Sequence, residues 1–201
     1  MLKKEGLPPP GQRYGRKFII YADLGIPDVD IERYRLRVNG LVERELEFTY
    51  DELKQKATME YVRDFHCVTR WSIKDVRWKG VPMLDIIREA GVKGEAKWVM
   101  FHCIDGYTAP VPMEYVTDGQ AMVALYMNGE PLSLEQGFPA RPFMPNLYGW
   151  KSAKWLNGIE FIADYEDGYW EERGYHEVGD VNREERFKDF SASRQKKRPV
   201  L

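Results

Sequence analysis

The sequence predicts a mixed α+β domain, and two observations lead to that fold class. Segments with strand character outnumber helical segments along the chain. The helical segments do not alternate regularly with the strands, which argues against a doubly wound parallel sheet. The chain has 201 residues, of which 43% are hydrophobic. It is therefore long enough to bury a sizeable core without disulfide bonds.

The first half of the chain carries four predicted elements. Alternating apolar residues at 34–38 predict a strand. Residues 49–56 predict a short helix, because they open with the Thr-x-x-Glu pattern of a capping box. The stretch 59–68 is rich in β-prone residues and leads into a polar loop. Residues 82–90 predict a second helix, since proline suits a first helical turn and a glycine follows at 91.

The second half predicts three strands around one long loop. Residues 97–104 form an apolar run that ends in an Asp-Gly turn. Residues 122–127 form another, closed by Asn-Gly. The stretch 134–153 is dense in glycine, proline and aromatic residues, which indicates an ordered loop that carries function. Strand character returns at 154–163.

Composition divides the chain into three parts. Residues 1–17 are rich in proline, glycine and charge, which favours an extended N-terminal arm. Residues 18–165 hold all the predicted elements and form the predicted domain. Residues 166–201 are a charged extension without periodicity, and its basic run at 194–198 is more typical of a solvated tail than of a binding patch.

Charge and cysteine content exclude several classes of protein. The formal net charge of −2 gives no global positive field to hold nucleic acid. No apolar run is long enough to span a membrane, and the first 17 residues lack the apolar stretch of a secretory signal. Only two cysteines are present and they form no C-x-x-C pair. We therefore expect a cytoplasmic protein with reduced thiols.

Cys67 is the first candidate for chemistry. A predicted strand delivers its thiol to a loop that also holds the cation of Arg70 and the ring of Trp71. A cation beside a thiol favours the thiolate, which is both a nucleophile and a ligand for soft metals. The alternative is a small buried side chain, because cysteine is among the most buried residue types.

Cys103 lies inside an apolar strand, where packing is the simpler interpretation. The pairs His66-Cys67 and His102-Cys103 raise the hypothesis of a zinc site. Strand geometry argues against it, because adjacent residues of a strand point to opposite faces. The short ligand spacings of structural zinc sites are also missing.

A second candidate region is basic and aromatic. It places Arg141, Lys151 and Lys154 close together in sequence, with a hydroxyl at Ser152. Fixed cations, a hydroxyl and loop amides suit a phosphate group. The sequence contains neither of the glycine-rich nucleotide motifs, G-x-x-x-x-G-K-[ST] or G-x-G-x-x-G. The alternative is a solvated basic loop, although its two tryptophans argue against a mobile surface.

The two regions together resemble a known family. The motifs are Cys-Val-x-x-Trp-Ser from Cys67, Gly-x-Pro-x-Arg ending at Arg141, and Tyr-Gly-aromatic-Lys-x-x-Lys ending at Lys154. In combination they resemble the molybdopterin-binding domain of the sulfite oxidase family, above all its small single-domain members. The resemblance spans roughly residues 18–165. It implies an α+β fold with coiled mixed sheets around a buried molybdenum-molybdopterin cofactor.

The resemblance also implies roles for individual residues. It makes Cys67 the thiolate ligand of molybdenum, and Arg70 the cation that orients an anionic substrate. It places Gln136 beside the pterin and Lys154 at the pterin phosphate. The full set of implied cofactor contacts besides Cys67 is Tyr21, Ala22, Cys103, Gln136, Arg141, Ser152, Ala153 and Lys154.

The implied activity is oxygen-atom transfer to or from a small substrate, either a sulfite-like anion or a sulfoxide. Electrons would be exchanged with a separate partner, since we recognise no second redox site in the sequence. The run Val68-Thr69-Arg70-Trp71-Ser72 differs from the Ala-Gly-Asn-Arg-Arg of animal and plant sulfite oxidases, so substrate and direction stay open. Two alternatives are a non-catalytic molybdopterin-binding module and a metal-free anion-binding module.

Overall fold

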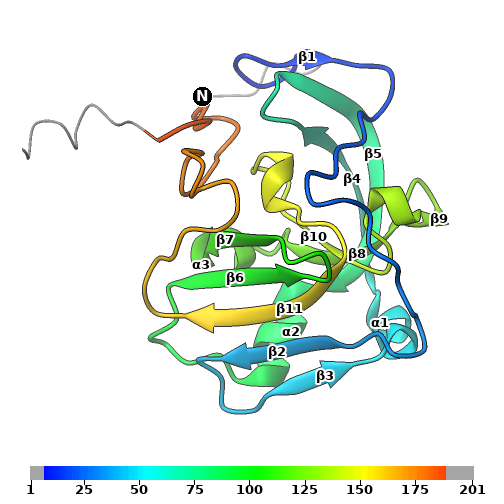
Figure 1. The fold of residues 1–201 in the computed structure, drawn as a ribbon, viewed down its shortest axis with the longest axis vertical. Coiled ribbons are helices and arrows are strands. Elements are labelled where there is room, and N and C mark those ends of the chain that lie inside the picture. The colour runs from blue at the N-terminus through cyan, green and yellow to red at the C-terminus, as the bar shows by residue number, and fades with distance from the viewer. Residues whose placement is uncertain (1–6, 189–201) are drawn as a thin grey trace, which may run out of the picture.

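Two β-sheets dominate the computed structural model, which describes residues 7–188 (Figure 1). The larger sheet of this described part has six strands, with the long strand β5 at its centre. β5 pairs with β4 and β8 in antiparallel fashion and with β1 in parallel. The strands of this sheet are β1 (Arg13–Tyr14), β4 (Met59–His66), β5 (Trp71–Pro82), β8 (Met122–Met127), β9 (Glu130–Pro131) and β10 (Arg141–Phe143).

The second sheet has the strand order β3-β2-β11-β6-β7. Its central strand β11 runs parallel to β2 and antiparallel to β6, so the beginning and the end of the fold meet in one sheet (Figure 1). Its strands are β2 (Leu36–Gly40), β3 (Leu46–Phe48), β6 (Trp98–Cys103), β7 (Thr108–Pro112) and β11 (Leu156–Ile162).

Short helices connect the strands. They are α1 (Tyr50–Lys56), α2 (Met83–Ala90), α3 (Met113–Val116) and two 3-10 helices, Leu134–Gln136 and Gly149–Lys151. The capping box before α1 is present as predicted: Glu52 N donates to Thr49 Oγ1 at 3.3 Å, and Thr49 N donates to Glu52 Oε2 at 2.8 Å. Gly91 ends α2 in the left-handed region with φ 64°, where glycine is favoured. Local signals therefore place the start of α1 and the end of α2.

The main hydrophobic core joins the two sheets. Its buried side chains come from β2, β6 and β11 of one sheet and from β5 and β8 of the other, together with α2. A second cluster covers the opposite face of the larger sheet, where Trp78 stacks on Phe143 with ring centroids 4.0 Å apart. Strand β8 supplies both clusters, since Val123 faces the main core and Met122 the second. Both faces of the larger sheet are thus buried.

The structure confirms the predicted α+β class and most of the predicted elements. Strand β5 is the main element that the sequence does not predict. Its pairing shifts register between Lys79 and Gly80, so the burial pattern does not alternate regularly. Gly80 allows β8 to come close, because a Cβ there would lie 2.1 Å from Val123 O.

Both outer segments of the described chain pack against the fold. Arg13 and Tyr14 pair with the start of β5, and residues 166–188 contribute Val181 to a cluster with Tyr148 and Trp150. The division of the chain at 17 and 165 stays a prediction. The basic run at 194–198 lies outside the described residues. In residues 7–188 no helix is both long and apolar enough to cross a membrane.

Candidate functional site

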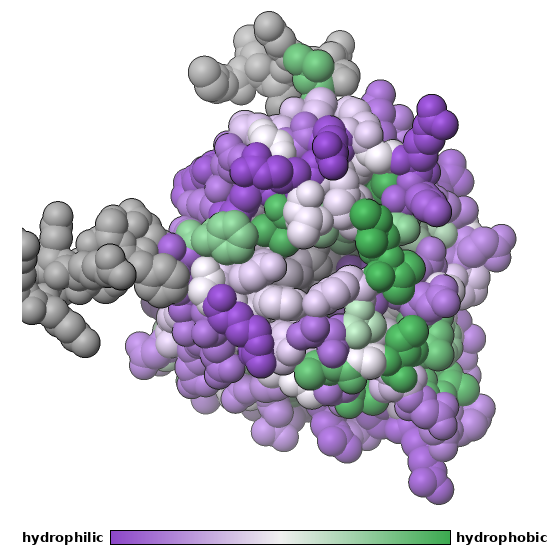
Figure 2. Space-filling view, turned by 45° about the horizontal axis from the view of Figure 1, so that its top comes forward, coloured by the Kyte–Doolittle hydropathy of each residue, from purple (hydrophilic) through white to green (hydrophobic). Residues whose placement is uncertain are grey.

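A cavity of about 460 Å³ opens between the N-terminal stretch 18–24, the loop after β4 and the loop 149–155. Figure 2 shows a hollow at the centre of this face, bordered by hydrophobic and polar side chains. The volume falls within the ~300–1,000 Å³ typical of small-molecule and cofactor sites. Of the sequence-predicted site residues, the cavity wall contains Tyr21, Ala22, Cys67, Gln136, Arg141, Ser152, Ala153 and Lys154.

Cys67 sits in the tight turn that joins β4 to β5. Cys67 N donates to Trp71 O at 2.9 Å, and Arg70 N donates to Cys67 O at 3.1 Å. Arg70 adopts φ 75°, which is uncommon for a residue with a side chain. The Cys67 thiol is half-buried, lies 3.2 Å from Thr69 Oγ1 and borders the cavity. A thiol held in this way on a cavity wall can act as a ligand to a soft metal.

Arg70 itself does not belong to the cavity wall as described. Its side chain is 63% exposed, and Nη1 lies 3.6 Å from Glu184 Oε1. The guanidinium charge is therefore shared with a carboxylate from the C-terminal segment. The assignment of Arg70 as the substrate-orienting cation stays a prediction.

Arg141 is a buried cation in the cavity wall. Its guanidinium donates to Ser152 Oγ at 2.9 Å, to Ser152 O at 2.7 Å and to Gln136 O at 2.8 Å. Arginine has five N–H donors, so these contacts leave donor capacity for a bound group. Burial lowers the pKa of Arg141 to about 10. The side chain is thus a rigid cation at neutral pH.

Lys154 is the second cation of the wall. Its Nζ donates to Tyr21 O at 2.6 Å and to Glu135 O at 3.1 Å, which joins the stretch 18–24 to the loop 149–155. Burial and the neighbouring charge of Arg141 lower the pKa of Lys154 to about 8. An anion bound here would be stabilised by both cations.

Two of the predicted contacts have side chains that are already engaged. Ser152 Oγ accepts from Arg141 and donates to Pro142 O. Gln136 Oε1 accepts from Ser133 N at 2.9 Å in a local capping box. Ser152 Oγ and Gln136 Oε1 are therefore already hydrogen-bonded within the protein. A bound group would contact these two residues through the Gln136 side-chain amide nitrogen or through backbone atoms.

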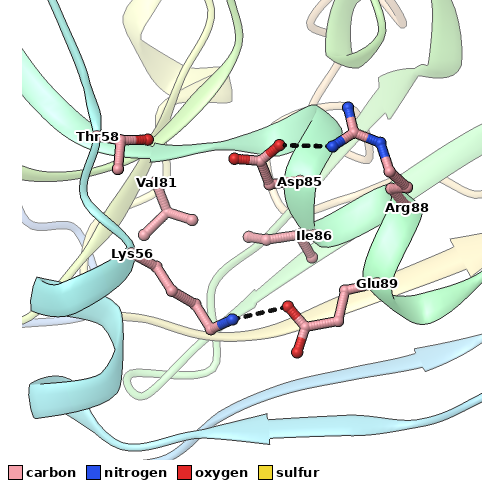
Figure 3. Close-up of a pocket in the computed structure, with 7 residues that line it drawn as sticks. All are labelled: Lys56, Thr58, Val81, Asp85, Ile86, Arg88 and Glu89. Carbon is pink, nitrogen blue, oxygen red and sulfur yellow. Dashed lines mark hydrogen bonds and ion pairs between the residues drawn. The ribbon is translucent and has the colours of Figure 1, made fainter.

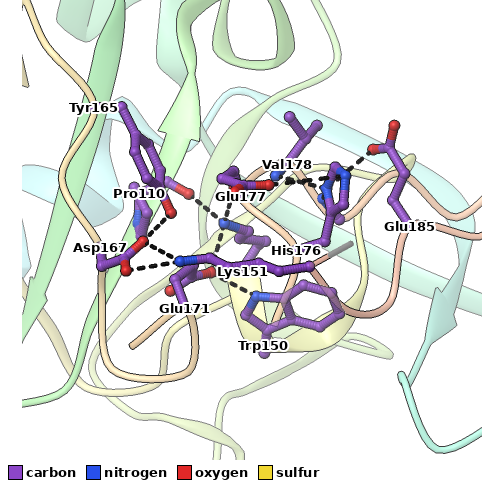
Figure 4. Close-up of polar contacts among 12 residues, drawn as sticks. Pro110, Trp150, Lys151, Tyr165, Asp167, Glu171, His176, Glu177, Val178 and Glu185 are labelled. Atoms are coloured by element: carbon purple, nitrogen blue, oxygen red, sulfur yellow. Dashed lines mark hydrogen bonds and ion pairs between the residues drawn. The ribbon is translucent and has the colours of Figure 1, made fainter. Parts of the chain in front are cut away.

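Lys151 corrects one sequence expectation. It is fully buried, and it does not line the cavity as the phosphate hypothesis requires. Its Nζ lies 2.6 Å from Glu171 Oε1 and donates to Pro110 O at 2.7 Å and to Glu177 O (Figure 4). Trp150 Nε1 donates to the same Glu171 carboxylate at 2.8 Å. Lys151 thus anchors the C-terminal segment beneath the cavity loop.

Cys103 packs in the main core, as its apolar strand predicts. It lies outside the described cavity wall, and burial raises the pKa of its thiol. Its assignment as a cofactor contact stays a prediction.

A second hollow, of about 470 Å³, lies between α1 and α2 (Figure 3). Its charges neutralise each other: Lys56 pairs with Glu89 at 2.8 Å, and Arg88 with Asp85 at 3.1 Å. It offers no thiol and is open to solvent. The candidate site is therefore the cavity beside Cys67.

The structure also brings residues to the site that the sequence reasoning missed. Trp170 and Tyr175, from the segment assigned as a charged extension, line the cavity together with Tyr107. Tyr175 also meets Trp150 edge-on, with ring centroids 5.1 Å apart. Large rings within a charged stretch are the signal that could have revealed this wall.

Comparison with known proteins decides the family. The model of the oxidoreductase molybdopterin-binding domain matches residues 23–170. The chain belongs to this family. An uncharacterised oxidoreductase of Bacillus subtilis, YuiH, is 39% identical over 185 residues, which cover 92% of this chain and 93% of YuiH.

Other relatives are larger than this chain. It is 33% identical to the Azospira oryzae protein named "Putative protein-methionine-sulfoxide reductase subunit YedZ1", over 79% of this chain and 60% of that protein. It is 36% identical to the mitochondrial sulfite oxidase of Drosophila melanogaster, over 52% of this chain and 20% of the relative. The crystal structure of the sulfane dehydrogenase SoxCD from Paracoccus pantotrophus superposes with a TM-score of 0.63 and 28% identity, covering 70% of this chain and 41% of that one.

The cofactor of this oxidoreductase family is molybdenum-molybdopterin, and the cavity suits it. Cys67 offers a thiol ligand for the metal, and Arg141 and Lys154 offer two cations for a phosphate in the same wall. Aromatic rings supply the apolar surface that a flat heterocycle needs. The donor set of the cavity therefore matches a metal bound through sulfur and a phosphorylated organic group.

Proposed function

We propose that this protein catalyses oxygen-atom transfer on a small substrate at a molybdenum-molybdopterin centre. The observation that carries the proposal is one cavity whose wall contains a thiol, Cys67, and two cations, Arg141 and Lys154. The bound molybdenum supplies two-electron oxygen-atom chemistry, which no amino-acid side chain provides. The family match supports the cofactor.

Each predicted residue of the cavity wall then has a role within the proposal. Cys67 ligates the metal, held by the turn between β4 and β5. Lys154 and Arg141 hold the phosphate. The remaining contacts frame the pterin through the cavity wall and its backbone, and they are Tyr21, Ala22, Gln136, Ser152 and Ala153.

For the substrate we favour a neutral sulfoxide over the sulfite anion. Arg70, the cation nearest to Cys67 in sequence, is paired with Glu184 and lies outside the cavity wall as described. The wall carries rings such as Trp71 and Trp150, and its two cations, Arg141 and Lys154, are assigned to the phosphate in this proposal. The Azospira oryzae relative named for methionine-sulfoxide reduction supports the same choice. Reduction consumes two electrons and two protons per sulfoxide and releases a thioether and water.

In this proposal the electrons come from a separate donor protein. The proposed location of the enzyme is the cytoplasm. Dye-coupled turnover tests the proposal with protein purified from a host that makes molybdopterin. We expect about one molybdenum per chain, and oxidation of reduced viologen that depends on an added dialkyl sulfoxide. Sulfite with ferricyanide as electron acceptor is the matched assay for the opposite reaction.

The same assays separate the alternatives. Molybdenum binding without turnover of either substrate would indicate a non-catalytic cofactor-binding module. A folded protein that takes up no molybdenum even after reconstitution would favour a metal-free anion-binding module. Turnover of sulfite alone would support the proposed catalytic function but show that the substrate is sulfite and not a sulfoxide.

A further inference from the structure

The backbone of the turn that carries Cys67 is held from outside the turn. Cys67 O accepts a hydrogen bond from Gln12 Nε2 at 2.9 Å. Val68 O accepts one from the Arg186 guanidinium. Arg70 O accepts one from Arg13 N at 3.0 Å. The donors therefore come from residues near the two ends of the described chain.

The Arg186 side chain is held in place by several neighbouring groups. Its side chain is only 6% exposed, and its guanidinium carbon lies 4.7 Å from the centre of the Tyr148 ring. Nε lies 3.3 Å from Glu184 Oε1, and the same carboxylate pairs with Arg70. A buried guanidinium with an ionic partner, a stacked ring and a carbonyl acceptor has little freedom to reorient.

The N-terminal arm closes against this guanidinium. Arg186 Nη2 donates to Pro10 O at 3.5 Å. Gly11 has φ 67°, and a Cβ there would lie 2.1 Å from Glu184 Oε1 and 2.8 Å from Arg186 Nη2. Glycine favours this approach, because it adopts the positive φ without strain and adds no Cβ beside the two side chains. The arm and the C-terminal segment thus meet directly behind the Cys67 turn.

We propose that Gln12 and Arg186 are positioning residues for the Cys67 thiol: together they form a clasp that fixes the turn in a metal-binding geometry. This inference rests on the proposed role of Cys67 as the molybdenum ligand. The turn needs such support because Arg70 holds a left-handed conformation that a side chain disfavours. Residues that orient a metal ligand affect retention of the metal without touching it.

Hydrogen exchange on the full-length, cofactor-free chain tests the clasp directly. The variant is Arg186→Met, which keeps an unbranched apolar stem but removes the guanidinium and its donors. We expect the amides of residues 64–72 to exchange about tenfold faster, because the local opening loses a hydrogen bond to a charged group. Exchange in β11 should stay unchanged.

The controls use matched residues. Arg183→Met removes an arginine from the same segment whose side chain is 68% exposed, and it should leave residues 64–72 unaffected. Arg186→Lys keeps the charge and should restore part of the protection. Gln12→Ala removes the other arm of the clasp and serves as an independent test if Arg186→Met does not fold.

The second readout is molybdenum retention in loaded protein. We expect Arg186→Met to lose molybdenum to dialysis about tenfold faster than the wild type and to shift the thiolate-to-metal absorption band, with partial rescue by Arg186→Lys. Unchanged exchange of residues 64–72 in both Arg186→Met and Gln12→Ala would overturn the clasp. Uniformly faster exchange over the whole chain would also overturn it, since Arg186 would then support the fold in general. Local acceleration in a chain whose wild type binds no molybdenum would support the clasp and refute the proposed function.

Discussion

The two His-Cys pairs of this protein place their thiols in different environments. In the first pair His66 ends β4 and Cys67 begins the turn after it, where the thiol is half-buried at a cavity wall. His102-Cys103 ends β6, and its thiol is buried in the main core. In the second pair the imidazole faces outward instead, where His102 Nε2 lies 2.8 Å from Glu160 Oε2. The same dipeptide thus presents a thiol to a cavity in one place and to the core in the other, because Cys67 lies in the turn after β4 whereas Cys103 lies within β6, on the strand face that packs in the main core.

Two lysines show the same contrast three residues apart. Lys151 is fully buried against Glu171, whereas Lys154 lines the cavity and bonds to Tyr21 O. Burial lowers the pKa of both side chains; the fully buried Glu171 carboxylate opposes the shift of Lys151, and the more exposed Asp105 and Glu135 oppose that of Lys154. Residue type therefore identifies the cavity region, while the packing of each side chain decides whether it serves the site or the fold.

Replacing the two cysteines in turn should give the largest difference. We expect Cys67→Ser to lower the molybdenum content by at least about 100-fold, because a hydroxyl is a poor substitute for a thiolate on a soft site. Elemental analysis of the purified variants measures this directly.

The matched control is Cys103→Ala. It should retain its molybdenum and lose about 1 kcal/mol of unfolding free energy through a small core cavity. Equal loss of molybdenum in both variants would show that the two cysteines do not differ in role.

Lys151→Met should destabilise the fold by about 3 kcal/mol, since it leaves the Glu171 carboxylate buried without a cation. Urea unfolding measures the change. Lys154→Met should cost about 1 kcal/mol or less, because this side chain is only partly buried. The double variant Lys151→Met/Glu171→Leu should recover most of the lost stability, and failure to recover would mean that the pair is not the cause.

The smallest expected effect is on the pH dependence of anion binding. In the free protein Lys154 is protonated below its pKa of about 8 and loses its charge above it. Sulfate carries a constant charge in this range, so its affinity for cofactor-free protein should be full at pH 7 and fall about tenfold by pH 9. Calorimetric titration of the wild type and Lys154→Met measures the effect. If the wild-type affinity for sulfate did not change with pH, Lys154 would not contribute to anion binding.

Local sequence carried a large part of the fold. Three signals each lie within a few neighbouring residues and can therefore be recognised from the sequence alone. They are the capping box at Thr49, the glycine after α2 and the apolar run of β8. The motif around Cys67 and the basic, aromatic loop before β11 marked the two sides of the cavity for the same reason.

The remaining features depend on contacts between distant parts of the chain. Arg186 reaches Val68 across 118 positions and Gln12 reaches Cys67 across 55, so no local pattern reveals either contact. The register shifts of β5 arise from its pairing with β4 and β8. The sequence by itself determined the fold class, the family and the chemistry that the loops can offer. Only the tertiary structure decided which cations face the cavity and which residues hold the Cys67 turn, because burial and pairing are properties of the packed chain.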